Sequence, residues 1–263
     1  MTAVVSEPTL QALADRLRDA QERRTPCEPL TAEFPDLTLA EAYRIAGRNV
    51  ARLGAPIVGR KIGLTSAAVQ RQLGVDQPDF GALVAGMEVP EGGEADFSRL
   101  LQPRVEGEIA FVLGRDLQGP GVTAAQVLAA TDFVLPAIEV ADCRIADWRI
   151  KVQDTVADNA AAAMYVLGSR PASPRDLDMR LAGLALRING EVATTGAGAA
   201  CLGNPVNAVA WLANTLGALG TPLSAGEVVL AGAMCPLVAV LPGDCVEVAI
   251  SGLGSVAVRF SEA

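Results

Sequence analysis

The sequence predicts an α+β fold in which a mostly helical N-terminal cap covers a larger, β-rich core. Apolar residues recur at helical spacing in the first third of the chain. Short apolar or alternating segments bounded by glycine and proline dominate from about residue 100. With 263 residues, 51% of them apolar, the chain can bury a substantial core. We therefore expect a helical cap region at residues 1–90 and a β-rich core at residues 91–263.

Two helical segments predict the cap. Apolar residues between positions 10 and 17 repeat at helix spacing, and Thr38 and Glu41 form a capping box at the start of a second helix. A short apolar strand at 56–64 and a short helix at 66–73 are expected to follow.

Short strands and two helices predict the core. The expected strands lie at residues 105–113, 133–141, 163–167, 182–189, 227–232, 237–241, 245–250 and 255–260. One helix begins at Thr123, with Gln126 completing a capping box, and another begins at Asn204 and runs to about Leu219. The last two strands alternate apolar and polar residues between turns, which indicates an antiparallel sheet.

Three glutamates lie where apolar side chains are expected, and the first two are Glu106 and Glu108 in PRVEGEIAFVLG. Because side chains alternate along a strand, this pair projects from one face, within about 7 Å of each other. Val105, Ile109 and Phe111 point to the other face, so both faces are expected to be largely covered. Two carboxylates this close repel unless a cation or a shared proton relieves them. The alternative is a pair on the solvated face of a half-buried sheet.

Glu139 in FVLPAIEVAD favours the buried interpretation. It is the only charged residue between Phe133 and Ala141, and charges inside such runs are rarely buried without a partner. Three convergent carboxylates form a good cage for a hard divalent cation. The residues therefore indicate a metal-dependent enzyme, while the pattern alone leaves open whether Glu139 folds back beside the pair.

The chain contains no histidine, which excludes Ser-His-Asp and Cys-His catalysis, histidine bases and histidine metal ligands. Acid–base chemistry must then use carboxylates, lysine, tyrosine or metal-bound water. This composition favours Mg²⁺ or Mn²⁺ held by oxygen atoms over zinc. Five scattered cysteines without C-x-x-C spacing fit reduced thiols in the cytoplasm.

Charge and composition exclude several classes of partner. The net charge of −9 comes without a basic cluster, so nucleic acid is not an expected partner. No stretch reaches the ~20 apolar residues of a membrane span, and the N-terminus lacks a signal-peptide pattern, so we expect a cytoplasmic protein without a membrane partner. The glycine patterns GLGSVA and GAGAAC lack the strand–turn–helix context of a dinucleotide site.

Several motifs combine into a pattern more specific than any one of them. They are GRKIGLTS, GVDQPDFG, PRVEGEIAFVL, LPAIEVAD and DWRIKVQDTVADNA. Together they resemble the 2-keto-4-pentenoate hydratases, which belong with the 4-oxalocrotonate decarboxylases in the fumarylacetoacetate hydrolase superfamily. The likeness runs from about residue 8 to the C-terminus. One departure is Ala161, where relatives often carry serine, so a polar contact near the site is missing or supplied by a backbone group.

The resemblance implies a mixed β-sandwich or roll core with an N-terminal helical cap, and a homo-oligomer, typically a pentamer or decamer. It implies Mg²⁺ or Mn²⁺ held by Glu106, Glu108 and Glu139. The expected substrate is a small molecule, a 2-hydroxy-2,4-dienoate from meta-cleavage of an aromatic or steroid ring. Water would add at its C4 to give a 4-hydroxy-2-oxo acid.

The resemblance also implies roles for three further residues. Lys61 would stabilise negative charge on the substrate or relay a proton, Asp79 would transfer a proton, and Asn159 would orient substrate or water. From the residues alone, each has a structural alternative. These alternatives are a surface lysine, a turn aspartate beside Pro78, and a loop-capping asparagine.

Other functions remain as alternatives. Hydrolysis of a C–C bond commonly relies on a histidine base, so the absence of histidine argues against it. Decarboxylation of 4-oxalocrotonate, a 2-oxo-3-hexenedioate, needs the same cation, and the chain could also be a non-catalytic partner subunit of such an enzyme. Hydration is favoured because the stretch from Val228 to Val240 carries no charge that could pair with a distal carboxylate.

Overall fold

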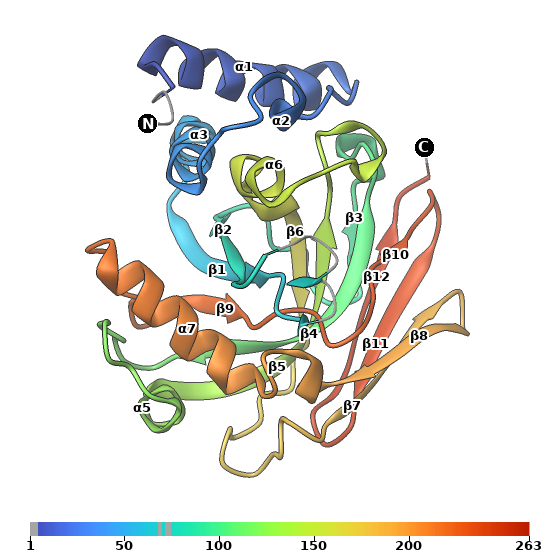
Figure 1. The fold of residues 1–263 in the computed structure, drawn as a ribbon. Coiled ribbons are helices and arrows are strands. Elements are labelled where there is room, and N and C mark those ends of the chain that lie inside the picture. The colour runs from blue at the N-terminus through green and yellow to red at the C-terminus, as the bar shows by residue number, and fades with distance from the viewer. Residues whose placement is uncertain (1–4, 68–69, 72–74, 263) are drawn as a thin grey trace.

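Two β-sheets form the body of the computed structural model, which describes residues 5–67, 70–71 and 75–262. The seven-stranded sheet has the order β2-β1-β9-β4-β5-β6, with β10 paired to β4, and the five-stranded sheet has the order β3-β12-β11-β7-β8 (Figure 1). The larger sheet comprises β1 (Ile57–Gly63), β2 (Asp79–Val84), β4 (Arg104–Leu113), β5 (Thr131–Ala141), β6 (Ala162–Leu167), β9 (Val228–Leu230) and β10 (Val238–Ala239). The smaller comprises β3 (Glu94–Ala95), β7 (Gly183–Ile188), β8 (Glu191–Ala197), β11 (Cys245–Ile250) and β12 (Gly254–Phe260).

The main core lies between these two sheets. Ile109 and Phe111 on one face of β4 belong to the same buried cluster as Val248 of β11 and Val256 of β12. Two further helices, α5 (Ala124–Ala130) and α7 (Pro205–Ala218), close this core from the side. The apolar face of β4 is therefore used for packing, which leaves its glutamate-bearing face for the site.

Four helices form the cap, which gathers above the larger sheet at the top of Figure 1. They are α1 (Glu7–Arg23), α2 (Leu30–Glu33), α3 (Leu39–Arg52) and α6 (Val152–Ala157). Leu10, Leu30 and Ile45 are fully buried among them in a cluster separate from the main core. The helical spacing of the apolar residues produces this shared face.

The predicted helix starts are confirmed. Thr38 and Glu41 form a complete capping box at the start of α3, and Thr123 does the same with Gln126 at α5. The Asn204 side chain accepts from the Val206 N–H at the start of α7. A side-chain oxygen at each N-cap satisfies a backbone N–H group that the helix itself cannot pair.

All eight strands predicted for the core are present, and their ends agree within two residues. The structure adds α2, β2, β3, β8 and α6, which the sequence analysis did not predict. Strand β8 is an exposed edge of small and polar residues, so it carries no apolar alternation. Helix α6 is six residues long and almost entirely buried, so it carries no amphipathic period.

The region before residue 90 is not purely a cap, because β1 and β2 are strands of the larger sheet. The helix expected at 66–73 lies only partly within the described residues, of which positions 67, 70 and 71 are helical. Among the helices of the described segments, none is long and apolar enough to cross a membrane.

Candidate active site

The antiparallel pairing of β4 with β5 brings the three predicted glutamates together. Glu106 lies directly opposite Glu139, and Glu108 follows two residues along the same face of β4. Each residue offers a carboxylate oxygen, and these oxygens lie within 4.8 Å of one another. The three residues are at most 5% exposed, so the solvated-face alternative for the pair is wrong.

Burial and mutual repulsion disfavour the charged forms of these acids. Burial, followed by the charge of Glu139, raises the pKa of Glu106 to about 8. The same two causes raise the pKa of Glu108 well above its ordinary value. A cluster of carboxylates in this state needs either protons or a cation to compensate it.

Lys61 supplies part of that compensation. Its ammonium group lies 2.8 Å from Glu139 Oε1, and the residue is 4% exposed, so it is not a surface lysine. Burial acts to lower the pKa of Lys61, but the surrounding carboxylates, Glu139 first, hold it above its ordinary value. With Asp79, Glu106, Glu108 and Glu139 ionised, four negative charges face one positive charge, which leaves a net charge of −3.

The donor atoms of the cluster fit a hard divalent cation. Within the described part of the chain, Glu108 Oε1 and Glu139 Oε2 are buried without a hydrogen-bond partner. Unpaired buried carboxylate oxygens are costly unless another group completes them. Oxygen ligands at a net negative site are those that Mg²⁺ and Mn²⁺ prefer.

Asp79 begins β2 at the register position opposite Gly63. It is 2% exposed and lies within the strand, so the turn-aspartate alternative is wrong. A Cβ atom at Gly63 would collide with Asp79 Oδ1, so a larger residue there would displace this carboxylate. Burial, opposed by the Lys61 charge, raises the pKa of Asp79 to about 6. An aspartate near this pKa can exchange a proton close to neutral pH.

Tyr43 from the cap holds the strand that carries Asp79, and the sequence analysis did not identify it. Its ring stacks on Phe80 with 4.4 Å between centroids, and its hydroxyl accepts from the Phe80 N–H at 3.3 Å. The chain has only two tyrosines, and the capping-box helix places this one, which was the available signal.

Asn159 caps the free edge of β2. Its Oδ1 accepts from the Ala82 N–H at 2.8 Å, and its Nδ2 donates to the Ala82 carbonyl at 2.9 Å. Strand β2 ends the sheet, so these backbone groups have no neighbouring strand to pair with. The side chain therefore has the structural contact of the alternative interpretation, and its contact with substrate stays a prediction.

Asn159, Ala160 and Ala161 form a left-handed turn, with φ values of 54°, 52° and 57°. Such a turn is costly for residues with a Cβ and persists only where its surroundings fix it. The Ala161 N–H donates to Asp158 O and its carbonyl accepts from Asp142 N, so both backbone groups are engaged within the protein. A Cβ at Gly81 would collide with Asn159 O, so the turn packs directly on β2.

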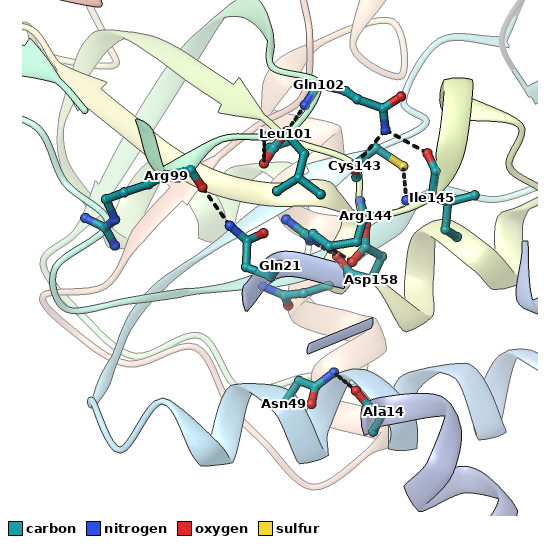
Figure 2. Close-up of polar contacts among 12 residues, drawn as sticks. Ala14, Gln21, Asn49, Arg99, Leu101, Gln102, Cys143, Arg144, Ile145 and Asp158 are labelled. Atoms are coloured by element: carbon teal, nitrogen blue, oxygen red, sulfur yellow. Dashed lines mark hydrogen bonds and ion pairs between the residues drawn. The ribbon is translucent and has the colours of Figure 1, made fainter. Parts of the chain in front are cut away.

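A buried ion pair fixes Asp158, the residue that precedes this turn. The Arg144 Nε and backbone N–H donate to the Asp158 carboxylate, and Arg144 Nη2 donates to the Asp158 carbonyl. Figure 2 shows the pair beside Gln102, whose Nε2 donates to the carbonyls of Cys143 and Ile145 at 2.9 Å each. The position of Arg144, fourteen residues before Asp158, gave no local sequence signal of this contact.

Comparison with known proteins identifies the family. The model for the fumarylacetoacetate (FAA) hydrolase C-terminal domain matches residues 64–261. A 2-keto-4-pentenoate hydratase of Paraburkholderia xenovorans is 54% identical over 250 residues, covering 94% of this chain and 93% of the relative. A 2-hydroxyhexa-2,4-dienoate hydratase of Comamonas testosteroni is 46% identical, covering 96% of this chain and 98% of the relative.

A solved structure shows the same fold over the full length. The 4-oxalocrotonate decarboxylase from Pseudomonas putida G7, complexed with magnesium and adipate, has a TM-score of 0.92 at 40% identity. The match covers 98% of this chain and 100% of that one. The fold and its buried acidic site define a protein of the fumarylacetoacetate hydrolase superfamily. Within it, the chain belongs to the 2-keto-4-pentenoate hydratase family.

We expect Glu106→Gln to weaken Mg²⁺ binding by on the order of tenfold or more, because it removes one anionic ligand. The fold should survive, since the change removes a buried charge that its neighbours repel. Isothermal titration calorimetry measures the affinity and thermal unfolding in a chelator checks the fold. Glu191→Gln on exposed β8 is the control. Unchanged Mg²⁺ affinity in Glu106→Gln would contradict the ligand assignment.

Mg²⁺ affinity should rise with pH up to about 8. In the cation-free protein the raised pKa of Glu106 means that this acid is protonated at lower pH, so an entering cation must displace the proton. The affinity should therefore change by up to about tenfold per pH unit for each proton released. Titration at pH 6, 7 and 8 in two buffers of different ionisation enthalpy measures both quantities. A constant affinity with no proton release would show that the acids bind the cation already ionised.

Proposed function

We propose that the chain is a divalent-cation-dependent hydratase that adds water to 2-hydroxypenta-2,4-dienoate or a close homologue. The product is a 4-hydroxy-2-oxo acid, as expected in meta-cleavage catabolism of aromatic compounds. The observation that carries the proposal is the buried cluster of Glu106, Glu108 and Glu139 beside Lys61, in a chain 54% identical to a 2-keto-4-pentenoate hydratase. We further propose a homo-oligomer, a pentamer or decamer, in the cytoplasm.

The three glutamates would hold Mg²⁺ or Mn²⁺. Their unpaired oxygens and the magnesium in the complex of the related decarboxylase support this assignment. When bound, the cation polarises the C2 oxygen of the substrate as a Lewis acid. The protein must then bind the C1 carboxylate, move protons and admit water.

Lys61 would bind the negative charge of the substrate. Its ammonium group is fixed by Glu139, and the surrounding acids keep it protonated, so it can stabilise an enolate form of the substrate without rearrangement. Its position in the middle of β1 makes it rigid. Rigid, desolvated charges of this kind are effective in stabilising charge that develops during a reaction.

Asp79 would move the protons. Ketonisation of the dienol breaks its O–H bond and forms a C–H bond at C5, and water then adds across C3 and C4, with its hydroxyl at C4 and a proton at C3. In the described structure Asp79 Oδ1 is buried without a hydrogen-bond partner, and it lies on the same face of the sheet as Lys61. A carboxyl group free to accept and return a proton suits both steps.

Asn159 would keep these groups aligned and contact substrate or water. Its amide holds β2 at Ala82, three residues after Asp79. The left-handed turn that it begins packs on Gly81, which is paired with Lys61 across the sheet. The turn therefore lies on the face of the sheet that carries both proposed catalytic side chains.

The segment around the metal ligands favours a substrate with one carboxylate. Residues 228–240 carry no charge, and this stretch lies beside the glutamates because the Gly232 N–H donates to Glu108 Oε2. An apolar neighbourhood suits a vinyl or alkyl end of a dienoate, whereas a second carboxylate there would need a cationic partner.

We expect Lys61→Met to reduce kcat/KM by about 10²–10⁴-fold, in the range typical for the loss of a catalytic charge or proton-transfer group. Stability should fall much less, because methionine keeps the apolar stem. The chain's other lysine, exposed Lys151, gives the control Lys151→Met. Steady-state kinetics and thermal unfolding are measured together. Wild-type kcat and KM in Lys61→Met would show that this lysine has no catalytic role.

Parallel product analysis tests the reaction itself. Loss of the dienoate absorbance is followed for 2-hydroxypenta-2,4-dienoate and its methyl homologue, with the 4-hydroxy-2-oxo acid of the same carbon number as the expected product of each. Release of CO₂ is followed for 2-oxo-3-hexenedioate. We expect hydration of the monocarboxylates and little CO₂. Rapid CO₂ release without hydration would assign the chain to decarboxylation, and no turnover of either class would support the partner-subunit alternative.

A further inference from the structure

The segment after β9 lies against β4 on both sides of Glu108. The Ala231 and Met234 N–H groups donate, at 3.2 and 3.0 Å, to the carbonyls of the residues flanking Glu108. Between them, the Gly232 N–H donates to Glu108 Oε2 at 2.7 Å. This charge-assisted bond fixes one oxygen of the carboxylate and leaves Oε1 without a partner among the described residues.

Gly232 must be held through its backbone. Its φ of 101° requires glycine, and a Cβ atom there would collide with the Thr65 side chain. A residue without a side chain has no packing contact of its own to set the direction of its N–H group. Groups that bond to its carbonyl therefore help to set that direction.

Cys201 provides such a group. Its Sγ donates to the Gly232 carbonyl at 2.9 Å and lies 3.3 Å from the Ala233 carbonyl. The side chain is fully buried, and burial, followed by the charge of Glu108, raises the pKa of the thiol, so it stays protonated and can donate. Its loop is tied to the site as well, because the Leu202 N–H donates to the Thr65 carbonyl at 3.1 Å.

We propose that Cys201 is a positioning residue for the metal centre. Its thiol holds the Gly232 carbonyl, Gly232 directs its N–H at Glu108 Oε2, and Glu108 Oε1 is thereby presented to the cation. The inference rests on the proposed cation site. Groups that orient a metal ligand from outside the coordination shell contribute measurably to metal affinity.

Mg²⁺ titration of the full-length protein tests the proposal without using activity. Cys201→Ala should weaken Mg²⁺ binding by about tenfold, the low end for loss of an orienting group. Cys201→Ser, which keeps a donor at the same place, should recover most of the affinity. Cys143→Ala removes a buried cysteine of the cap core and should leave the affinity unchanged.

The outcomes separate this inference from the proposed function. If the wild-type protein binds no Mg²⁺, the cation site itself fails. If wild type binds and Cys201→Ala binds equally well, or if Ser and Ala weaken binding equally, the positioning role of the thiol is overturned. Thermal unfolding in a chelator checks each fold. Should Cys201→Ala not fold, Cys201→Val fills the space without a donor and gives the same comparison.

Discussion

Three buried glutamates lie on the paired strands β4 and β5, and their burial is the constraint on which the rest of the structure depends. The register sets Glu106 opposite Glu139, so the two backbone positions stay together as long as the strands are paired. Water cannot screen carboxylates that are at most 5% exposed. The molecule must therefore surround them with compensating groups, and Lys61 on the neighbouring part of the sheet is one such group.

The segments around the glutamate cluster act mainly by fixing the backbone of β2. Strand β2 would be an ordinary sheet edge, but the Asn159 amide pairs with it and the left-handed turn packs on it. The buried Arg144–Asp158 pair holds this turn (Figure 2). Breaking a buried pair of this kind costs several kcal/mol, which is of the same order as the strain of three left-handed residues. The cap thus contributes to the site by keeping β2 and its aspartate in place.

Similarity alone does not separate two reactions of the superfamily, because the chain is similar both to a hydratase and to a decarboxylase. Chelation of a 2-oxo acid is common to both reactions, so selectivity must depend on the groups that meet the far end of the substrate. In this chain the uncharged stretch from β9 to β10 lies beside Glu108. The same segment donates a hydrogen bond to Glu108, so under the proposed function one stretch of backbone would both orient a cation ligand and border the far end of the substrate.

The local pattern of the sequence was sufficient to predict most of the secondary structure. Capping boxes, helical spacing and strand alternation act between residues a few positions apart, so helices α3 and α5 and the eight core strands could be predicted. Strand β2 and helix α6 were not predicted, because their stability comes from burial against distant segments. Intrinsic propensity and amphipathic periodicity are weak in such short elements.

The sequence by itself determined which chemistry is available. A chain without histidine must use carboxylates, lysine, tyrosine or metal-bound water for acid–base chemistry, and its glutamates inside apolar strands favour a hard cation. Only the tertiary structure decided that Glu139 meets the pair, that Asn159 caps β2, and that Cys201 reaches Gly232. These contacts join residues 31 to 77 positions apart, and strand register and chain reversal, not local pattern, set their distances.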